Sequence, residues 1–177
     1  MDDEARPAGG SADGPGEFED FFRNRFASAA RALGLVVRDP ELGQDIAQEA
    51  FARVFGRWGR MESEEHARNF VLRVGLNLAR SHQRRERRFR RLIGTGRLEP
   101  RTSAAPTDRR VEVFEALGRL SGRQRACLVL VDYLDLGDAE AGRILGLAPS
   151  TIRVHLARGR AAMRALLGDR QPEGNRP

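Results

Sequence analysis

The sequence predicts an all-α protein made of two small helical domains joined by a flexible linker. Apolar residues recur at steps of three and four positions in several segments, which is the period of one helix face. No segment shows the alternation of apolar and polar residues that marks a half-buried strand. The composition agrees, since the chain holds one Trp and one Tyr but many of the helix formers Ala, Leu, Arg and Glu.

The first half of the chain carries three amphipathic stripes, which predict one helical bundle over 16–93. Gly34 is expected to end or weaken the first helix, and Asp39-Pro40 is expected to start the second. The stripes consist of Phe18, Phe21, Phe22, Phe26, Ala29, Ala30 and Leu33; of Ile46, Ala47, Ala50, Phe51, Val54, Phe55 and Trp58; and of Phe70, Val71, Val74 and Leu78.

A segment at 94–108 has no stripe but several Gly and Pro residues, so it predicts a flexible linker. A second domain with one compact core is expected over 109–168. The two ends, 1–15 and 169–177, are expected to be disordered, the first of them as an acidic tail. Within the second domain, helical segments are expected at 109–119, 121–134, 138–145 and 149–167.

Positive charge is concentrated in two places. The whole chain has a formal net charge of +6, and all 31 basic residues are Arg. Counting charged residues by segment gives −6 for 1–22, +8 for 80–110 and +4 for 149–167. Each basic cluster lies near the end of a helical block, which is the pattern of a protein that touches nucleic acid at two points.

The composition excludes several classes of protein. A single cysteine, Cys127, rules out an intramolecular disulfide and a CxxC metal site. His66, His82 and His155 are too far apart for a ligand set, so we expect no metal and no cofactor. The longest apolar run, 126–131, is far short of a membrane span, and the acidic start is unlike a secretory signal. We therefore expect a soluble cytoplasmic protein with no membrane partner.

The segment from Asp138 onward has the form of a helix-turn-helix. Gly146 would supply the sharp turn and Leu147 would pack in the corner. Pro149 fits the first turn of the second helix, where its missing N–H is not needed. Asp138 is expected to cap the first helix. The alternative is an ordinary helical hairpin with a solvated basic face.

The second helix of this motif has one apolar and one basic face. Since the N-terminal part of a recognition helix meets base edges, Arg153 and Val154 are placed to read bases. Arg158 and Arg160 are better placed to hold phosphates. With Ile152, Leu156 and Met163 turned inward, the expected outward residues are Ser150, Arg153, Val154, Ala157 and Arg158.

Several segments together resemble conserved regions of bacterial sigma factors. Gly-Gln-Asp-Ile-Ala-Gln-Glu-Ala-Phe at 43–51, followed by Trp58, is similar to the acidic-Asp-x-x-Gln-Glu-x-Phe pattern of the second region. Asn-Phe-Val-Leu-Arg-Val-Gly-Leu-Asn at 69–77 resembles the next stretch of that region. The segment from Leu117 through the helix-turn-helix resembles the fourth region. The short two-domain layout is similar to the extracytoplasmic-function (ECF) group of the sigma-70 family, and its SigE-type branch is the most similar.

The resemblance implies a subunit that binds core RNA polymerase, recognises a promoter and helps to open it for transcription initiation. Asp45, Gln48 and Glu49 match residues that dock on the clamp helices of the large polymerase subunit, and the polymerase flap is a further expected contact. Many members of the family have an anti-sigma factor, which is a candidate partner here.

The resemblance also implies two DNA contacts, about two helical turns apart on one promoter. The minus-ten element would be bound by Arg73, Asn77, Arg80, Arg84, Arg85 and Arg88. The minus-35 element would be bound by Ser150, Thr151, Arg153, Val154, Ala157 and Arg158.

Two other functions compete with this interpretation. A free-standing helix-turn-helix regulator would use the N-terminal bundle for dimerisation or sensing, but it gives no reason for the Asp45/Gln48 pattern. A nucleic-acid enzyme would need a metal site, and Asp132, Asp135 and Asp138 are its best candidates, with no histidine or further acidic cluster to join them. We therefore do not expect an enzyme.

Overall fold

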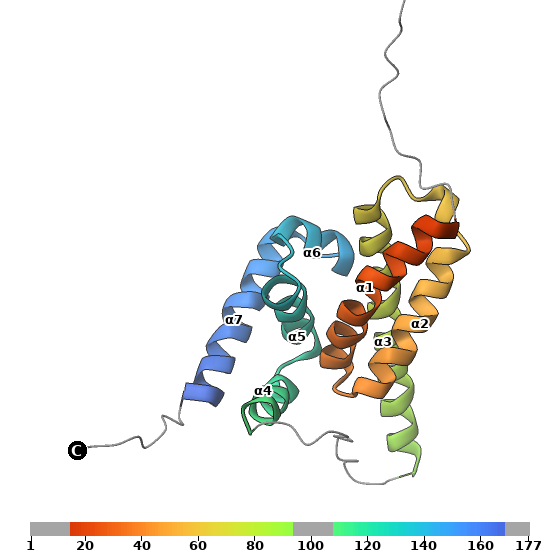
Figure 1. The fold of residues 1–177 in the computed structure, drawn as a ribbon. Helices are drawn as coiled ribbons and strands as arrows, with labels where there is room; N and C mark the ends of the chain where they lie inside the picture. The colour runs from red at the N-terminus through yellow and green to blue at the C-terminus, as the bar shows by residue number, and fades with distance from the viewer. Residues whose placement is uncertain (1–14, 94–107, 169–177) are drawn as a thin grey trace, which may run out of the picture.

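A computed structural model describes residues 15–93 and 108–168, and every regular element in these two ranges is a helix (Figure 1). The all-α prediction is therefore confirmed. The tail expected at 1–15, the linker at 94–108 and the tail at 169–177 lie outside the described residues, except that Pro15 begins α1 and Asp108 begins α4. The elements are α1 (Pro15–Val37), α2 (Pro40–Phe55), η1 (Trp58–Arg60), α3 (Glu64–Ile93), α4 (Asp108–Arg119), α5 (Gly122–Leu128), η2 (Val129–Tyr133), α6 (Asp138–Leu145) and α7 (Pro149–Gly168).

Helices α1, α2 and α3 form the N-terminal unit, which has an aromatic core at one end. The Phe21 ring packs 5.4 Å from the Phe51 ring and 5.1 Å from the Trp58 ring, measured between centroids. All three rings are buried. As predicted, α2 starts at Asp39-Pro40, because the Asp39 carboxylate caps the helix and accepts a hydrogen bond from the Leu42 N–H at 3.1 Å.

The crossing of α1 and α2 depends on two glycines. A Cβ atom at Gly43 would lie 2.3 Å from the backbone nitrogen of Gly34 and 2.9 Å from the carbonyl oxygen of Ala30. The helices therefore touch through their backbones, which only glycine allows at this position. Gly34, expected to end or weaken the first helix, does not end it, since α1 continues to Val37; it makes the close contact with Gly43 instead.

Helices α4 to α7 form the C-terminal unit. Ser121 begins α5 with a capping box, in which its hydroxyl accepts from the Gln124 N–H and the Gln124 side chain accepts from the Ser121 N–H. Helix α5 continues into the π-helical turn η2, and Asp135 then takes a left-handed conformation with φ of 55°. This turn places Leu136 back in the buried core.

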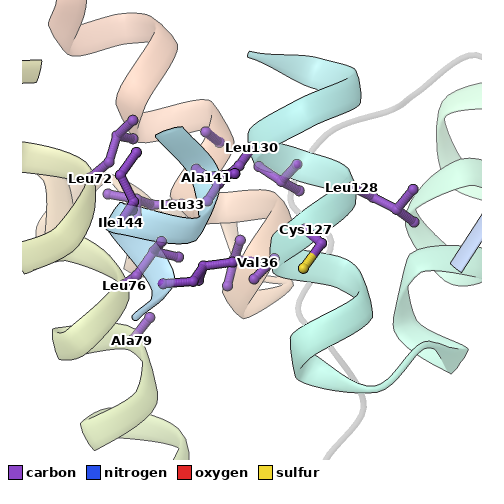
Figure 2. Close-up of a cluster of buried hydrophobic side chains, with 14 of the residues drawn as sticks. Leu33, Val36, Leu72, Leu76, Ala79, Cys127, Leu128, Leu130, Ala141 and Ile144 are labelled. Atoms are coloured by element: carbon purple, nitrogen blue, oxygen red, sulfur yellow. The ribbon is translucent and has the colours of Figure 1, made fainter. Parts of the chain in front are cut away.

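Besides the aromatic core of the N-terminal unit, a second apolar core spans both units. Helix α6 packs on α3, and both α5 and η2 pack on α1. We call this contact the domain seam (Figure 2). Its buried residues are Leu33, Val36, Leu72, Leu76 and Ala79 from the N-terminal unit and Cys127, Leu130, Leu136, Ala141 and Ile144 from the C-terminal unit.

Polar contacts flank the domain seam at both ends. The Arg68 guanidinium of α3 is paired with the Glu140 carboxylate of α6, and their side chains are only 29% and 16% exposed. At the other end, Arg38 Nη1 donates to the Gly118 carbonyl oxygen at 3.4 Å. These contacts join residues more than 70 positions apart, so they fix how the two units are oriented.

The α1–α2 crossing gives a direct stability test. Gly43→Ala should destabilise the protein by about 1–3 kcal/mol, because the new methyl group forces the two helix backbones apart. Gly56→Ala is the matched control, since its Cβ would come no nearer than 3.8 Å to another atom and its φ of −62° suits any residue. Urea unfolding followed by circular dichroism measures both. Equal unfolding midpoints for the two variants would contradict the close crossing.

Candidate functional site

The helix-turn-helix is formed by α6 and α7. Gly146 ends α6 with a φ of 68°, in the left-handed region where a side chain is strained. The Leu147 N–H donates to the Gly142 carbonyl oxygen at 2.9 Å, and a Cβ at Gly142 would lie 2.6 Å from the Leu147 carbonyl oxygen. Helix α7 then begins at Pro149, as the sequence predicts.

One expected detail of this motif is wrong. Gly137 is the N-cap residue of α6 and Asp138 is its first helical residue, with no side-chain cap. The Asp138 carboxylate instead lies 3.7 Å from Arg153 Nη1 of α7. This pair joins the start of α6 to the start of α7.

Helix α7 presents the predicted face outward. Ile152 and Leu156 are 0% and 3% exposed, whereas Val154 is 47% exposed. Thr151 is half-buried beside this face. The face therefore mixes cations with small and apolar side chains, which is suited to base edges and thymine methyl groups. Its exposed members are Ser150, Arg153, Val154, Ala157 and Arg158.

Arg160, which the sequence places for a phosphate contact, has a carboxylate partner within the fold. Its guanidinium makes two hydrogen bonds to the Asp132 carboxylate, at 3.1 Å from Nε and 2.5 Å from Nη2. This hydrogen bonding raises the pKa of Arg160 above its usual value. Two hydrogen bonds therefore hold this guanidinium against Asp132 within the fold.

Helix α3 carries the second predicted DNA face. Five of the six predicted residues, spaced by three or four positions, share one side of the helix and are named at the end of this paragraph. The sixth, Arg85, is also exposed but lies about a quarter turn away. Arg80 is half-buried, and the others are exposed. Arg84 Nη2 donates to the Ser81 hydroxyl at 3.4 Å. The five residues are Arg73, Asn77, Arg80, Arg84 and Arg88.

Arg73, the first residue of this face, is engaged within the molecule. Its Nη2 donates to the Arg143 carbonyl oxygen of α6 at 3.3 Å. Sequence spacing could not reveal this contact, because the two residues are 70 positions apart. The minus-ten face predicted on α3 therefore lies directly beside the helix-turn-helix.

Helix α2 presents a polar face away from the core. Asp45, Gln48 and Glu49 are exposed, while Ile46 and Ala47 between them are buried. Glu49 accepts a hydrogen bond from Arg53 Nε at 2.9 Å. The structure thus brings these three residues together, as predicted, on a different helix from the two basic faces.

A feature absent from the sequence-based predictions is an apolar pocket of about 420 Å³. Val113, Leu117 and Met163 line it from α4 and α7, and the paired side chains of Asp132 and Arg160 line it as well. Leu35 of α1 also lines the pocket, so its outline depends on the domain seam. The periodicity of apolar residues predicts which side of a helix is buried, but it does not predict where a pocket remains between packed helices.

The described residues contain no group of three or more His, Cys, Asp and Glu residues that could hold a metal ion. Among the same residues, no helix combines the length and apolar character needed to cross a bilayer.

Two family models match the chain. The model for Sigma-70 region 2 matches residues 22–89, which comprise most of α1, all of α2 and most of α3. The model for Sigma-70, region 4, matches residues 110–163, which include the helix-turn-helix. We refer below to the N-terminal and C-terminal units as region 2 and region 4.

Solved structures support the same fold. The chain is similar to the sigma factor RpoE of Bartonella quintana, solved with the anti-sigma factor NepR, with a TM-score of 0.77 and 18% identity over 88% of this chain and 99% of that chain. It is also similar to CnrH, solved with the cytosolic domain of CnrY, with a TM-score of 0.67 and 20% identity over 91% and 94% of the two chains.

Sequence relatives identify the family. The RNA polymerase sigma-E factor of Streptomyces coelicolor is 28% identical over 151 residues, which cover 84% of each protein. The ECF RNA polymerase sigma factor SigC of Mycobacterium tuberculosis is 30% identical over 133 residues, covering 73% of this chain and 70% of the relative. The chain therefore belongs to the ECF group of the sigma-70 family and has the role of an RNA polymerase sigma factor in transcription initiation.

Proposed function

We propose that this sigma factor binds core polymerase through the polar face of α2 and grips one promoter at two points, with α3 at the minus-ten element and α7 at the minus-35 element. The observation that carries the proposal is that the molecule has two exposed basic helix faces. One lies on α3 of region 2 and the other on α7 of region 4. It acts in the cytoplasm as a binding subunit and not as an enzyme.

The α7 face supports reading of duplex DNA. A recognition helix enters the major groove with its N-terminal residues against the base edges. Arg153 and Val154 are exposed in the first turns of α7, where an Arg can pair with guanine and a Val can contact a thymine methyl group. Arg158 lies one turn further along, where a phosphate contact would fix the register.

The α3 face supports binding of the minus-ten element and its separated strand. Flipping a base out of the duplex costs a few kcal/mol, which contacts to the separated strand must offset. Exposed Arg84, Arg85 and Arg88 provide a row of cations along which a backbone can run. Asn77, on the same face, adds a side chain that can both donate to and accept from a base.

Two surfaces support binding to polymerase. The Asp45/Gln48/Glu49 face is exposed and polar over a buried apolar stripe, so it is accessible to a charged helix of the clamp, although Glu49 is also paired with Arg53. The apolar pocket beside α4 and α7 has the size and lining to receive side chains from the flap. By analogy with the Bartonella sigma factor, we also infer that an anti-sigma factor binds this chain.

The α2 face is tested by the double variant Asp45→Ala/Gln48→Ala. We expect its affinity for core polymerase to fall at least about tenfold, because two polar contacts at the interface are lost. Asn24→Ala/Glu115→Ala is the control, since it removes an amide and a carboxylate from exposed positions on α1 and α4. Native gel shift with core polymerase measures binding. Unchanged affinity in the α2 variant would show that a different surface binds core polymerase.

The α7 face is tested on promoters first recovered by run-off transcription from a genomic fragment library. Arg153→Ala should weaken transcription from them by about tenfold to a hundredfold and relax the preference at one base pair, because a bidentate base contact is lost. Arg164→Ala removes the same charge from the exposed far end of α7 and should leave that base preference unchanged. A uniform loss at all base pairs in Arg153→Ala would show that Arg153 contacts only phosphate.

A further inference from the structure

An acidic side chain of α6 lies against the recognition face of α7. The Asp138 carboxylate is 3.7 Å from Arg153 Nη1. Helix α7 itself contains no Asp or Glu, so this negative charge reaches the face from the neighbouring helix. Among the described residues, no other ion pair involves a residue of the α7 face. Arg153 differs in this respect from Arg158, the other arginine of that face.

The first turn of α6 does not use the Asp138 carboxylate as a cap. Gly137 is the N-cap residue, and no side chain caps the helix. An acidic residue in the first turn stabilises a helix through its dipole, but Glu140 in the same turn supplies such a charge as well. A carboxylate at a DNA-binding surface also repels phosphate groups. Helix stability alone thus gives no reason to place a second carboxylate beside a DNA-binding arginine.

The Asp138 and Arg153 side chains both extend from well-packed parts of the helix-turn-helix. Asp138 is three residues before Ala141, and Arg153 directly follows Ile152; both of these apolar neighbours are 0% exposed. The turn between the two helices is fixed by the close backbone contact at Gly142. Packing therefore sets the separation between the start of α6 and the first turns of α7, and with it the position of the carboxylate relative to the guanidinium.

The surroundings leave the Asp138 carboxylate to Arg153. Arg160 is also close to Asp138, but two hydrogen bonds hold it against Asp132. The Asp138 side chain is 32% exposed, whereas the Arg153 side chain is 63% exposed. The carboxylate is thus the more enclosed partner and the guanidinium the more open one. A guanidinium has five N–H donors, so those that do not face Asp138 remain for DNA.

A guanidinium held in this way favours guanine over adenine and over phosphate. Guanine presents two acceptors, O6 and N7, which match two N–H groups of one planar guanidinium, whereas adenine presents a donor at N6. An arginine that is free to rotate can turn to a phosphate, which carries no sequence information. A carboxylate partner restricts that rotation before DNA arrives. Bound DNA also excludes water from the pair, which strengthens the attraction between its two charges.

We propose that Asp138 is a positioning residue for base reading, whose carboxylate holds the Arg153 guanidinium toward a guanine of the minus-35 element and away from the DNA backbone. This inference rests on the proposed function, in which α7 binds that element. It adds a specificity-determining residue outside the recognition helix, which the helical spacing of α7 could not reveal. Asp138 acts through Arg153 and makes no base contact of its own.

Neutralising Asp138 provides the test. Asp138→Asn keeps the size of the side chain and removes its charge. Asp135→Asn is the matched control, because it makes the same change at an exposed position three residues earlier, where asparagine also tolerates the left-handed backbone. The full chain is assembled with core polymerase. Transcription is measured from promoters recovered by run-off transcription, with single base-pair replacements across the minus-35 element. Arg153→Ala and Arg153→Ala/Asp138→Asn complete a double-mutant cycle.

We expect Asp138→Asn to reduce the preference for guanine about threefold to tenfold at the base pair where Arg153→Ala also relaxes it, since the guanidinium keeps its charge but loses its alignment. Preferences at the other base pairs should stay as in the wild type. On the Arg153→Ala background, Asp138→Asn should have no further effect on base preference. Asp135→Asn should keep the wild-type preference at every base pair.

Several results would overturn the proposal. Unchanged preference in Asp138→Asn would show that the carboxylate does not align Arg153. An equal loss at all base pairs would show that Asp138 only stabilises α6. A change at a different base pair, or one that persists on the Arg153→Ala background, would show that Asp138 itself accepts a hydrogen bond from cytosine. A preference for a base other than guanine at the pair that Arg153 reads would also contradict it.

The single variant Arg153→Ala separates this inference from the proposed function. If Arg153→Ala changes no base preference, the proposed contact of α7 with the minus-35 element fails, and the positioning role fails with it. If Arg153→Ala relaxes one preference while Asp138→Asn leaves it intact, the positioning role alone fails.

Discussion

The structure depends on one apolar contact, the domain seam, in which Leu72 and Leu76 of α3 pack with Ile144 of α6. Each fully buried side chain of this kind contributes about 1.5–3 kcal/mol, which exceeds the worth of an exposed ion pair. The seam decides which faces of α3 and α6 meet water. It also shapes the pocket beside α4, because Leu35 of α1 forms one of its walls. The pocket and the water-exposed faces of α3 and α6 therefore depend on a single contact.

The same constraint explains the irregular backbone at the contact. The π-helical turn η2 and the left-handed Asp135 interrupt what would otherwise be one longer helix. Such conformations cost about 1–3 kcal/mol and persist only where packing compensates. Here they place Leu136 in the buried core that spans both regions. The irregularity thus gives region 4 a surface that fits region 2, and π-helical turns are frequent at such functional positions.

Local pattern was sufficient to predict most elements of the fold. The apolar stripes located the helices, and Asp39-Pro40, Gly146 and Pro149 marked their ends, because capping and turn geometry depend on neighbouring residues. The pattern failed where distant residues act. Gly34 is a close-contact residue only because Gly43 lies against it, and Arg160 is paired only because Asp132 comes from another helix. The domain seam could not be predicted from helical periodicity, because its apolar residues have the same spacing as residues buried within one unit. The Arg73–Arg143 contact could not be predicted either, because its two residues are 70 positions apart.

The central claim is that α3 and α7 of one chain contact promoter elements about two helical turns apart, which requires regions 2 and 4 to lie further apart on polymerase than they do in this structure. Pulsed dipolar spectroscopy tests it with spin labels at introduced cysteines replacing Ala27 of α1 and Ala165 of α7, both exposed. Native Cys127 can stay in place, because it is buried and its pKa is raised to about 11. The free protein should give one short distance, and addition of core polymerase should shift the population to a much longer one. An unchanged distance distribution on polymerase binding would contradict the account.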